Sequence, residues 1–191
     1  MPTNRHVINE TIAAYANAAI DGAYAAGGRE AVVQVRNQMT QILEYMATNI
    51  KLRLSFDDES YTEEQRESLV RNVFGDFDPI LVELMVVMAK RLDMSLLRRV
   101  HGQYEEYIES KLNFNVVDVV TVVDLDDNLR TVITNKAESD LGRDCVLVEH
   151  IDPSIQGGIV MSTRGRYVDA SVRSQLDRAR SVLKEKDGGE C

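Results

Sequence analysis

The stretch Ile151-Asp-Pro-Ser-Ile-Gln-Gly-Gly-Ile-Val160 decides how the second half of the chain is interpreted. Pro153-Ser154 is typical of a turn, and the apolar run 159–161 is typical of a strand. Between them stand Gly157 and Gly158. Two glycines in this setting either cradle a phosphate at a helix N-terminus or let the backbone approach another segment closely. Because a strand and not a helix follows them, we interpret the pair as a structural turn.

Upstream of this turn, at residues 113–115, the hydrophobic pattern changes from the helical period of about 3.6 to a period of 2. This change predicts a helical domain over residues 1–112 and a small α+β domain over residues 113–191. The α+β domain is expected to run strand, helix, strand, hairpin, helix. Its predicted elements are a strand through Val117, Val119, Thr121, Val123 and Leu125, a helix over 126–141 ended by Gly142, strands over 145–151 and 158–162, a hairpin turn over 163–166 that contains Gly165, a short strand at 167–168, and a last helix capped by Ser171.

The first 112 residues predict six helices, some of them short, packed as one bundle, so that the whole chain is mostly α. Gly27-Gly28 ends an alanine-rich first helix in the manner of a glycine C-cap. Thr62 and Gln65 fit a capping box, and Asp78-Pro79 fits an N-cap followed by proline in the first turn. The predicted helices cover residues 7–26, 29–47, 50–54, a segment that begins at Thr62 and stops at Gly75, 80–92 and 95–112.

Charge and composition exclude several functions. The 191 residues carry 31 acidic and 22 basic side chains, and the net charge of -9 would repel a phosphate backbone, so we expect no nucleic-acid partner. The longest apolar stretch, residues 80–89, is far shorter than the roughly 20 residues that span a bilayer. The N-terminus lacks the apolar run of a signal peptide. We therefore expect neither secretion nor direct membrane insertion. Cys145 and Cys191 have the spacing of neither a disulfide framework nor a zinc site.

The sequence carries no recognisable catalytic motif. His6, His101 and His150 lack metal-ligand spacing, and the serines lack a nucleophile elbow. A phosphate loop and a dinucleotide-binding glycine pattern are both missing. The acidic connector 55–60 lacks the central glycine of a calcium loop. We therefore expect no catalytic residues, no metal and no cofactor.

Residues 151–161, followed by Gly165 and by Val168-Asp-Ala-Ser-Val-Arg-Ser-Gln-Leu176, resemble the signature of the delta subunit of F-type ATP synthases. The mitochondrial relative of that subunit is the oligomycin-sensitivity-conferring protein. In the family, a Gly-Gly turn and a hairpin precede Asp-Gly-Ser-x-x-x-x-Leu, which opens the last helix. Ala170 stands where the family usually has glycine. Near the N-terminus, Tyr15-Ala-Asn-Ala-Ala-Ile20 is similar to the family's Tyr-Ala-x-Ala-hydrophobic segment, and the order of elements agrees over nearly the whole chain.

The resemblance implies a non-catalytic stator subunit that joins the catalytic head to the peripheral stalk in proton-driven ATP synthesis. In the family, the N-terminal helix of an α subunit binds a groove involving the first and fifth helices, and a b-type stalk subunit meets the C-terminal domain. For the groove we expect Ile12, Tyr15, Ala19, Met85 and Met88, and for the stalk the final hairpin and helix, including Val172 and Leu176. Since a targeting segment is missing, we expect a peripheral subunit on the cytoplasmic face of a bacterial membrane.

Two alternatives stay open at this point. The same apolar residues fit a plain role in the protein core. A nucleotide- or phosphate-binding enzyme or sensor would use the Gly157-Gly158 turn with Arg164 and Arg166 on the neighbouring hairpin. It predicts nucleotide binding that is lost on Gly158→Val.

Overall fold

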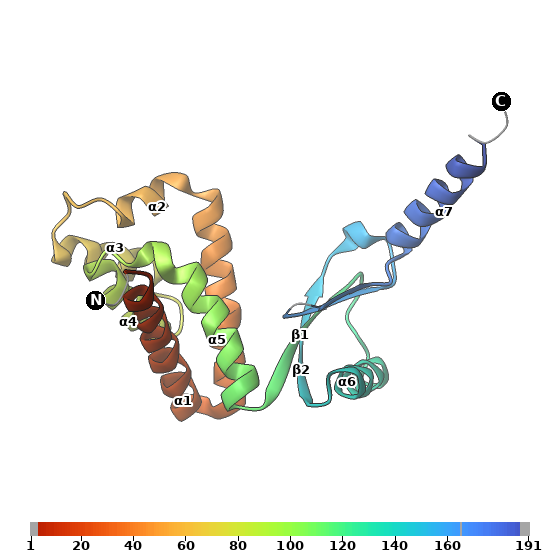
Figure 1. Cartoon of the computed structure of the whole chain (residues 1–191), viewed down its shortest axis with the longest axis horizontal. Helices are drawn as coiled ribbons and strands as arrows, with labels where there is room; N and C mark the ends of the chain where they lie inside the picture. The colour runs from red at the N-terminus through yellow and green to blue at the C-terminus, as the bar shows by residue number, and fades with distance from the viewer. Residues whose placement is uncertain (1–3, 165, 188–191) are drawn as a thin grey trace. The chain divides into compact units, whose positions relative to one another are not determined.

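The structure, a computed structural model, describes residues 4–164 and 166–187, and the side chains of residues 5–164 and 166–182. Gly165 of the predicted hairpin turn and Cys191 lie outside the described residues. The chain divides into two compact units, Met1–Leu112 and Asn113–Cys191 (Figure 1). Helices make up the first unit, and the second combines a four-stranded sheet with helices, which confirms the predicted fold class.

The helices of the first unit follow the predicted order. α1 is interrupted where the sequence predicts a break: Gly27 has φ -159° and Gly28 has φ 64°, neither of them helical with its ψ. The label α1 therefore covers two helical segments joined at a glycine pair. The elements are α1 (Asn4–Thr48), α2 (Ile50–Phe56), α3 (Glu63–Phe74), α4 (Pro79–Lys90), the short 3-10 helix η1 (Met94–Leu96) and α5 (Leu97–Lys111).

Two predicted helix starts are confirmed in atomic detail. Thr62 accepts a hydrogen bond from the Gln65 N–H at 3.3 Å, and the Gln65 side chain accepts one from the Thr62 N–H at 2.9 Å. Asp78 accepts from the Ile80 N–H at 2.9 Å, with Pro79 as the first residue of α4. Each carboxylate or hydroxyl oxygen satisfies a backbone N–H that a helix leaves without an internal partner.

The core of the first unit forms where both halves of α1 pack against α4 and α5. The Tyr104 hydroxyl donates to the Val32 carbonyl at 3.1 Å, which joins α5 to the second half of α1 inside this core. Phe74 of α3 stacks on Phe56 of α2 and contacts Phe77 edge to face. Other side chains that are fully or almost fully buried are Ile20, Met39, Ile42, Leu81, Met85, Met88, Met94 and Leu97. The predicted bundle is thus closed by its own apolar stripes.

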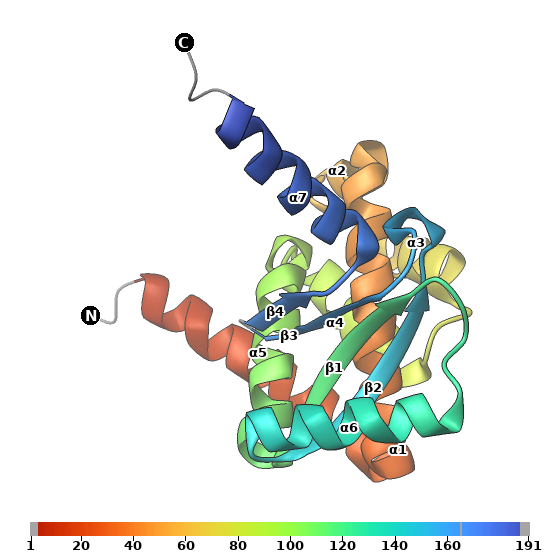
Figure 2. The ribbon, with the colours of Figure 1, turned by 90° about the vertical axis from the view of Figure 1, so that its right-hand side faces the viewer.

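The second unit contains one mixed sheet in the order β2-β1-β3-β4. β1 pairs with β2 in parallel and with β3 antiparallel, and β3 pairs with β4 as a hairpin. Figure 2 shows α6 running alongside β1 and β2, and α7 leading away from the sheet. The elements are β1 (Phe114–Thr121), α6 (Asp127–Leu141), β2 (Asp144–Ile151), the 3-10 helix η2 (Pro153–Ile155), β3 (Ile159–Thr163), β4 (Arg166–Asp169) and α7 (Val172–Asp187).

The predicted end of the first strand is wrong. The strand stops at Thr121, and Val123, expected on its buried face, is 70% exposed. The Thr121 hydroxyl donates to the Val123 carbonyl at 2.7 Å and so turns the chain away from the sheet. Leu125 is buried, but it packs from the loop before α6 into the cluster around Val117 and Val119. The alternation of apolar and polar residues predicted a longer strand because the chain can turn after Thr121 and still place every second residue, such as Leu125, against the core.

Candidate docking sites

An apolar groove runs between the first half of α1 and α4. Tyr15 and Ala19 from α1 face Ile80, Leu84 and Val87 from α4 across it. The remaining lining residues are Ala14, Ala18, Pro79 and Glu83. Alanines on α1 leave room beside the helix backbone, and Val87 keeps 46% of its surface exposed although its neighbours are buried. An exposed apolar groove between two helices matches the way proteins receive one face of an amphipathic helix.

The floor of this groove is held by a polar contact. The Tyr15 hydroxyl donates to the Asp93 carboxylate at 2.7 Å, which ties α1 to the segment after α4. Burial, together with this hydrogen bond and the nearby carboxylate charge, raises the pKa of Tyr15 to about 12. The hydrogen bond to Asp93 holds the Tyr15 ring in a defined position at the floor of the groove.

The rim of the groove beside α4 is charged but neutralised. Glu83 accepts two hydrogen bonds from the Arg71 guanidinium, at 2.7 and 3.1 Å, and Arg71 also donates to Glu67 at 2.9 Å. Lys90 completes the cluster through an ion pair of 2.5 Å with Glu67. The hydrogen bond from Arg71 holds the pKa of Glu83 below its usual range. Two cations and two carboxylates thus balance along this edge, which leaves apolar contact as the main chemistry of the groove.

Of the five residues expected at the groove, two line it. Tyr15 and Ala19 line it although they are themselves 7% and 1% exposed, whereas Ile12, Met85 and Met88 are buried and do not line it. Met85 and Met88 belong with Leu81 to the stripe of α4 that faces the interior. The neighbouring stripe Ile80, Glu83, Leu84 and Val87 reaches the groove. The spacing of that second stripe was visible in the sequence, but α4 is apolar on nearly all sides, so periodicity did not distinguish the two stripes.

In the second unit, the two glycines lie against the start of α7. Gly157 has φ 143° and Gly158 has φ 79°, and a Cβ atom at position 158 would stand 2.4 Å from the Ala170 carbonyl oxygen. The Val172 N–H donates to the Gly157 carbonyl at 2.9 Å, and the Ala170 N–H donates to the Ile159 carbonyl at 2.9 Å. The space beside the glycines is therefore filled by the backbone that leads into α7, which is the geometry of close backbone approach.

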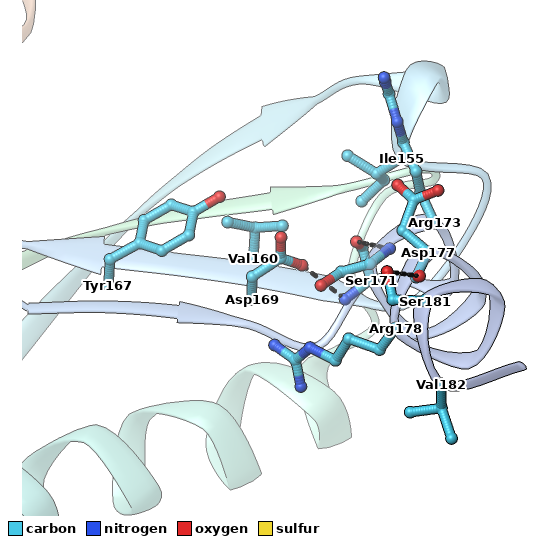
Figure 3. A pocket seen from close by; sticks show the side chains of 11 residues that line it. Ile155, Val160, Tyr167, Asp169, Ser171, Arg173, Asp177, Arg178, Ser181 and Val182 are labelled. Atoms are coloured by element: carbon cyan, nitrogen blue, oxygen red, sulfur yellow. Dashed lines mark hydrogen bonds between the residues drawn. The ribbon is translucent and has the colours of Figure 1, made fainter. Parts of the chain in front are cut away.

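The hairpin and α7 carry exposed apolar side chains. Val172 and Leu176 keep 39% and 58% of their surface exposed, and Tyr167 on β4 keeps 68%. Val172 also packs against Gly157, since a Cβ atom at position 157 would lie 3.1 Å from the Val172 Cγ2 atom. Ser171 caps α7 by accepting from the Ser174 N–H at 3.1 Å, as predicted. The first turn of α7 is thus held by hydrogen bonds (Figure 3), whereas the apolar side chains of Val172 and Leu176 are not covered by the rest of the unit.

The histidines and the hairpin arginine each make a structural contact within their own unit. His101 contacts the Thr40 hydroxyl at 3.0 Å, and His150 lies 3.3 Å from Asp118. The Arg166 guanidinium donates to the Asp140 carbonyl at 2.9 Å. Within residues 4–164 and 166–187, no group of three or more His, Cys, Asp or Glu side chains is arranged to hold a metal ion. In the same part of the chain, none of the helices has both the length and the apolar character to cross a bilayer.

A helical bundle with an open apolar groove, followed by a small α+β unit with an uncovered helix, is typical of a non-catalytic adaptor that binds other chains. Residues 12–183 match the model of the family described as ATP synthase delta (OSCP) subunit, and the chain belongs to that family. It is a non-catalytic stator subunit of an F-type ATP synthase, part of the complex that couples proton transport to ATP synthesis. The phosphate-binding alternative is set aside by this assignment.

The relatives support the assignment over most of the chain. The ATP synthase subunit delta of Rhodopirellula baltica is 29% identical over 183 residues, covering 91% of this chain and 80% of the relative. That of Salinibacter ruber is 27% identical and covers 90% of this chain and 89% of its own. A chain in the cryo-EM structure of the Toxoplasma gondii mitochondrial ATP synthase hexamer has the same fold. It aligns with a TM-score of 0.50 and 21% identity over 90% of this chain and 96% of that one.

Proposed function

We propose that each compact unit binds a different partner, residues 1–112 the catalytic head and residues 113–191 the peripheral stalk. The α1–α4 groove receives the amphipathic N-terminal helix of the α subunit. The hairpin and α7, including Val172 and Leu176, receive a b-type stalk subunit. The protein works on the cytoplasmic face of a bacterial membrane, in keeping with the bacterial source of most relatives named above.

The observation that carries the first contact is the uncovered apolar stripe of α4. Val87 is 46% exposed in a groove that is lined mostly by apolar side chains, and covering the exposed half of such a side chain is worth roughly 1 kcal/mol. The small side chains Ala14 and Ala18 let a second helix come close to the α1 backbone. A helix that presents apolar residues at i, i+3, i+4 and i+7 fits this surface.

A matched pair of variants tests the groove. Val87→Glu places a charge in the groove, and Leu54→Glu places the same charge on α2 at a site that is 58% exposed and outside the groove. We expect Val87→Glu to weaken binding of a peptide from the α-subunit N-terminus at least about tenfold, and Leu54→Glu to leave it unchanged. Isothermal titration calorimetry of the full chain measures both. If the two variants weaken peptide binding equally, the α-subunit helix does not bind in this groove.

The stalk contact has a test of the same design. Leu176→Glu on α7 and Leu129→Glu on α6 make the same change at residues that are 58% and 50% exposed. Only Leu176→Glu should weaken binding of the purified stalk subunit from the same ATP synthase. If Leu129→Glu weakens it and Leu176→Glu does not, the stalk binds α6 instead.

A further inference from the structure

The chain leaves α4 in a conformation that a bulky side chain rarely adopts. Leu92, two residues beyond the end of α4, has φ 60°, in the left-handed region that glycine takes without strain. The Leu92 N–H donates to the Ala89 carbonyl at 3.2 Å, and the Asp93 N–H donates to the Met88 carbonyl at 2.8 Å. This pair of hydrogen bonds ends a helix through a left-handed residue, which is usually glycine. The chain therefore carries a strained leucine where glycine would be less costly.

The strained turn places the Asp93 carboxylate at the floor of the α1–α4 groove. This carboxylate accepts from the hydroxyl of Tyr15, a lining residue of the groove, at 2.7 Å. Because Asp93 directly follows Leu92, a change in the φ of Leu92 moves the Asp93 side chain relative to α1. The groove floor thus depends on a turn that is unfavourable by itself, and such a turn persists only where the surrounding contacts hold it.

Two neighbouring residues of α3 hold Lys90, the last residue of α4. The Arg66 guanidinium donates through Nη2 to the Lys90 carbonyl at 3.3 Å, and the Glu67 carboxylate pairs with the Lys90 ammonium at 2.5 Å. Arg66 also donates through Nη1 to the Tyr61 carbonyl, in the segment before α3, at 2.5 Å. A positive charge is favourable at this end of α4, because the helix dipole is negative there. Arg66 therefore ties the end of α4 to α3, two residues before Leu92.

The guanidinium of Arg66 is buried without a carboxylate partner. The residue is 7% exposed, its acceptors among the described residues are the carbonyls of Tyr61 and Lys90, and its Nε has no hydrogen-bond partner there. Burying a charge is unfavourable unless its donors are paired, and an apolar side chain of similar volume is often more stabilising. Neither Arg66 nor Leu92 is the residue that stability alone favours at its position, and both act on the same turn.

We propose that Arg66 is a positioning residue for the α1–α4 groove: it holds the left-handed turn at Leu92 and so keeps Asp93 within reach of Tyr15 before a partner arrives. The inference rests on the proposed binding of the α-subunit helix in this groove and adds the device that preforms it. A preformed groove binds more tightly, because its walls do not have to be ordered during binding. Without Arg66, the turn relaxes toward negative φ and Asp93 moves away from Tyr15.

A matched pair of methionine substitutions separates positioning from stability. Arg66→Met removes the buried charge and keeps a long side chain, and Arg98→Met makes the same change at an exposed residue of α5 outside the groove. The probe is the α-subunit N-terminal peptide from the same ATP synthase, titrated against the full chain by calorimetry. We expect Arg66→Met to weaken peptide binding at least about fivefold, while the midpoint of urea unfolding stays the same or rises. Arg98→Met should change neither quantity.

A second substitution tests the link to the strained turn. Glycine adopts positive φ without strain, so Leu92→Gly should preserve the turn when Arg66 is replaced. We expect Arg66→Met/Leu92→Gly to recover peptide binding to within about twofold of the wild type. The NMR signal of the Tyr15 ring, assigned with Tyr15→Phe, should shift in Arg66→Met and return in the double variant. A general loss of packing would not be reversed by removing a leucine side chain.

The other outcomes overturn the inference in distinguishable ways. If Arg66→Met lowers both the urea midpoint and the peptide affinity, and Leu92→Gly restores neither, Arg66 contributes to stability alone. If Arg66→Met binds the peptide as the wild type does, the end of α4 keeps its position without the guanidinium. If the wild-type chain itself does not bind the peptide, the proposed function fails, and the positioning role fails with it.

Discussion

Gly22 on α1 lies directly against Ile80 on α4, so that a Cβ atom at position 22 would stand 3.2 Å from the Ile80 Cγ2 atom. The missing side chain lets the two helices come together at the end of the groove. Ile80 itself lines the groove, and any atom added to Gly22 therefore moves a wall of the proposed α-subunit site.

The first prediction is that Gly22→Ala weakens binding of the α-subunit peptide while it changes the stability of the bundle little. Alanine is favoured over glycine in a helix by about 1 kcal/mol, but here the gain is offset by the displacement of Ile80. We expect the free energy of unfolding to change by less than about 1 kcal/mol and the affinity for the α-subunit peptide to fall by about threefold or more. Urea titration and calorimetry on the full chain measure the two quantities.

Gly102→Ala on α5 is the matched control, because a Cβ atom there meets nothing within 4 Å. It should stabilise the bundle by up to about 1 kcal/mol and leave peptide binding as it is. If Gly22→Ala behaves in the same way as Gly102→Ala, then Gly22 does not set the groove.

Alanine substitutions at Gly158 and Gly142 distinguish the cost of a left-handed backbone from the cost of a steric clash. Gly158 and Gly142 both have positive φ, 79° and 70°, but only at Gly158 would a Cβ atom collide, at 2.4 Å from the Ala170 carbonyl oxygen. Gly142→Ala should cost about 1–2 kcal/mol for the left-handed conformation alone. Gly158→Ala should cost clearly more, because the Gly157-Gly158 turn must move away from α7. Thermal unfolding of the two variants checks the order, and equal losses would contradict the packing described for the turn.

The Tyr15–Asp93 contact predicts a loss of stability at alkaline pH. The folded state raises the pKa of Tyr15 from 10.0 to about 12, so it favours the neutral phenol. This contribution is fully present below pH 10 and is lost as the pH rises from about 10 to about 12. Tyr15→Phe removes it, and we expect the variant to lose less stability than the wild type over that range. Urea titrations at about pH 9 and about pH 11.5 measure the difference, and identical losses would show that Tyr15 ionises as easily folded as unfolded.

The half-buried thiol of Cys145 predicts slow alkylation. Burial, with the nearby charges of Glu138 and Asp144, raises its pKa, so less thiolate is present at a given pH. In a Cys191→Ser background, where only one thiol remains, iodoacetamide at about pH 8 should react several times more slowly than with free cysteine. A Cys145 that reacts as fast as free cysteine would mean that the cluster formed by α6 and the sheet opens readily.

Much of the fold was predictable because its signals are local. The capping box of Thr62 and Gln65, the Asp78-Pro79 start of α4 and the left-handed Gly142 after α6 each depend on residues within one helical turn. The end of β1 was not predictable in this way. The chain turns there with a hydrogen bond from Thr121 to the Val123 carbonyl, and the alternation of apolar and polar residues does not reveal such a turn.

The candidate groove shows the same limit. The residue pattern predicts that α4 is apolar, that α1 is rich in alanine and that both belong to a helical bundle. Which residues of α4 face the interior and which face the groove depends on the packed bundle: Met85 and Met88 face the interior, while Ile80 and Val87 face the groove. A helix face becomes core or surface through what packs against it, and α4 has apolar side chains in nearly every direction. Burial is a property of the assembled bundle, whereas helix formation is a property of neighbouring residues.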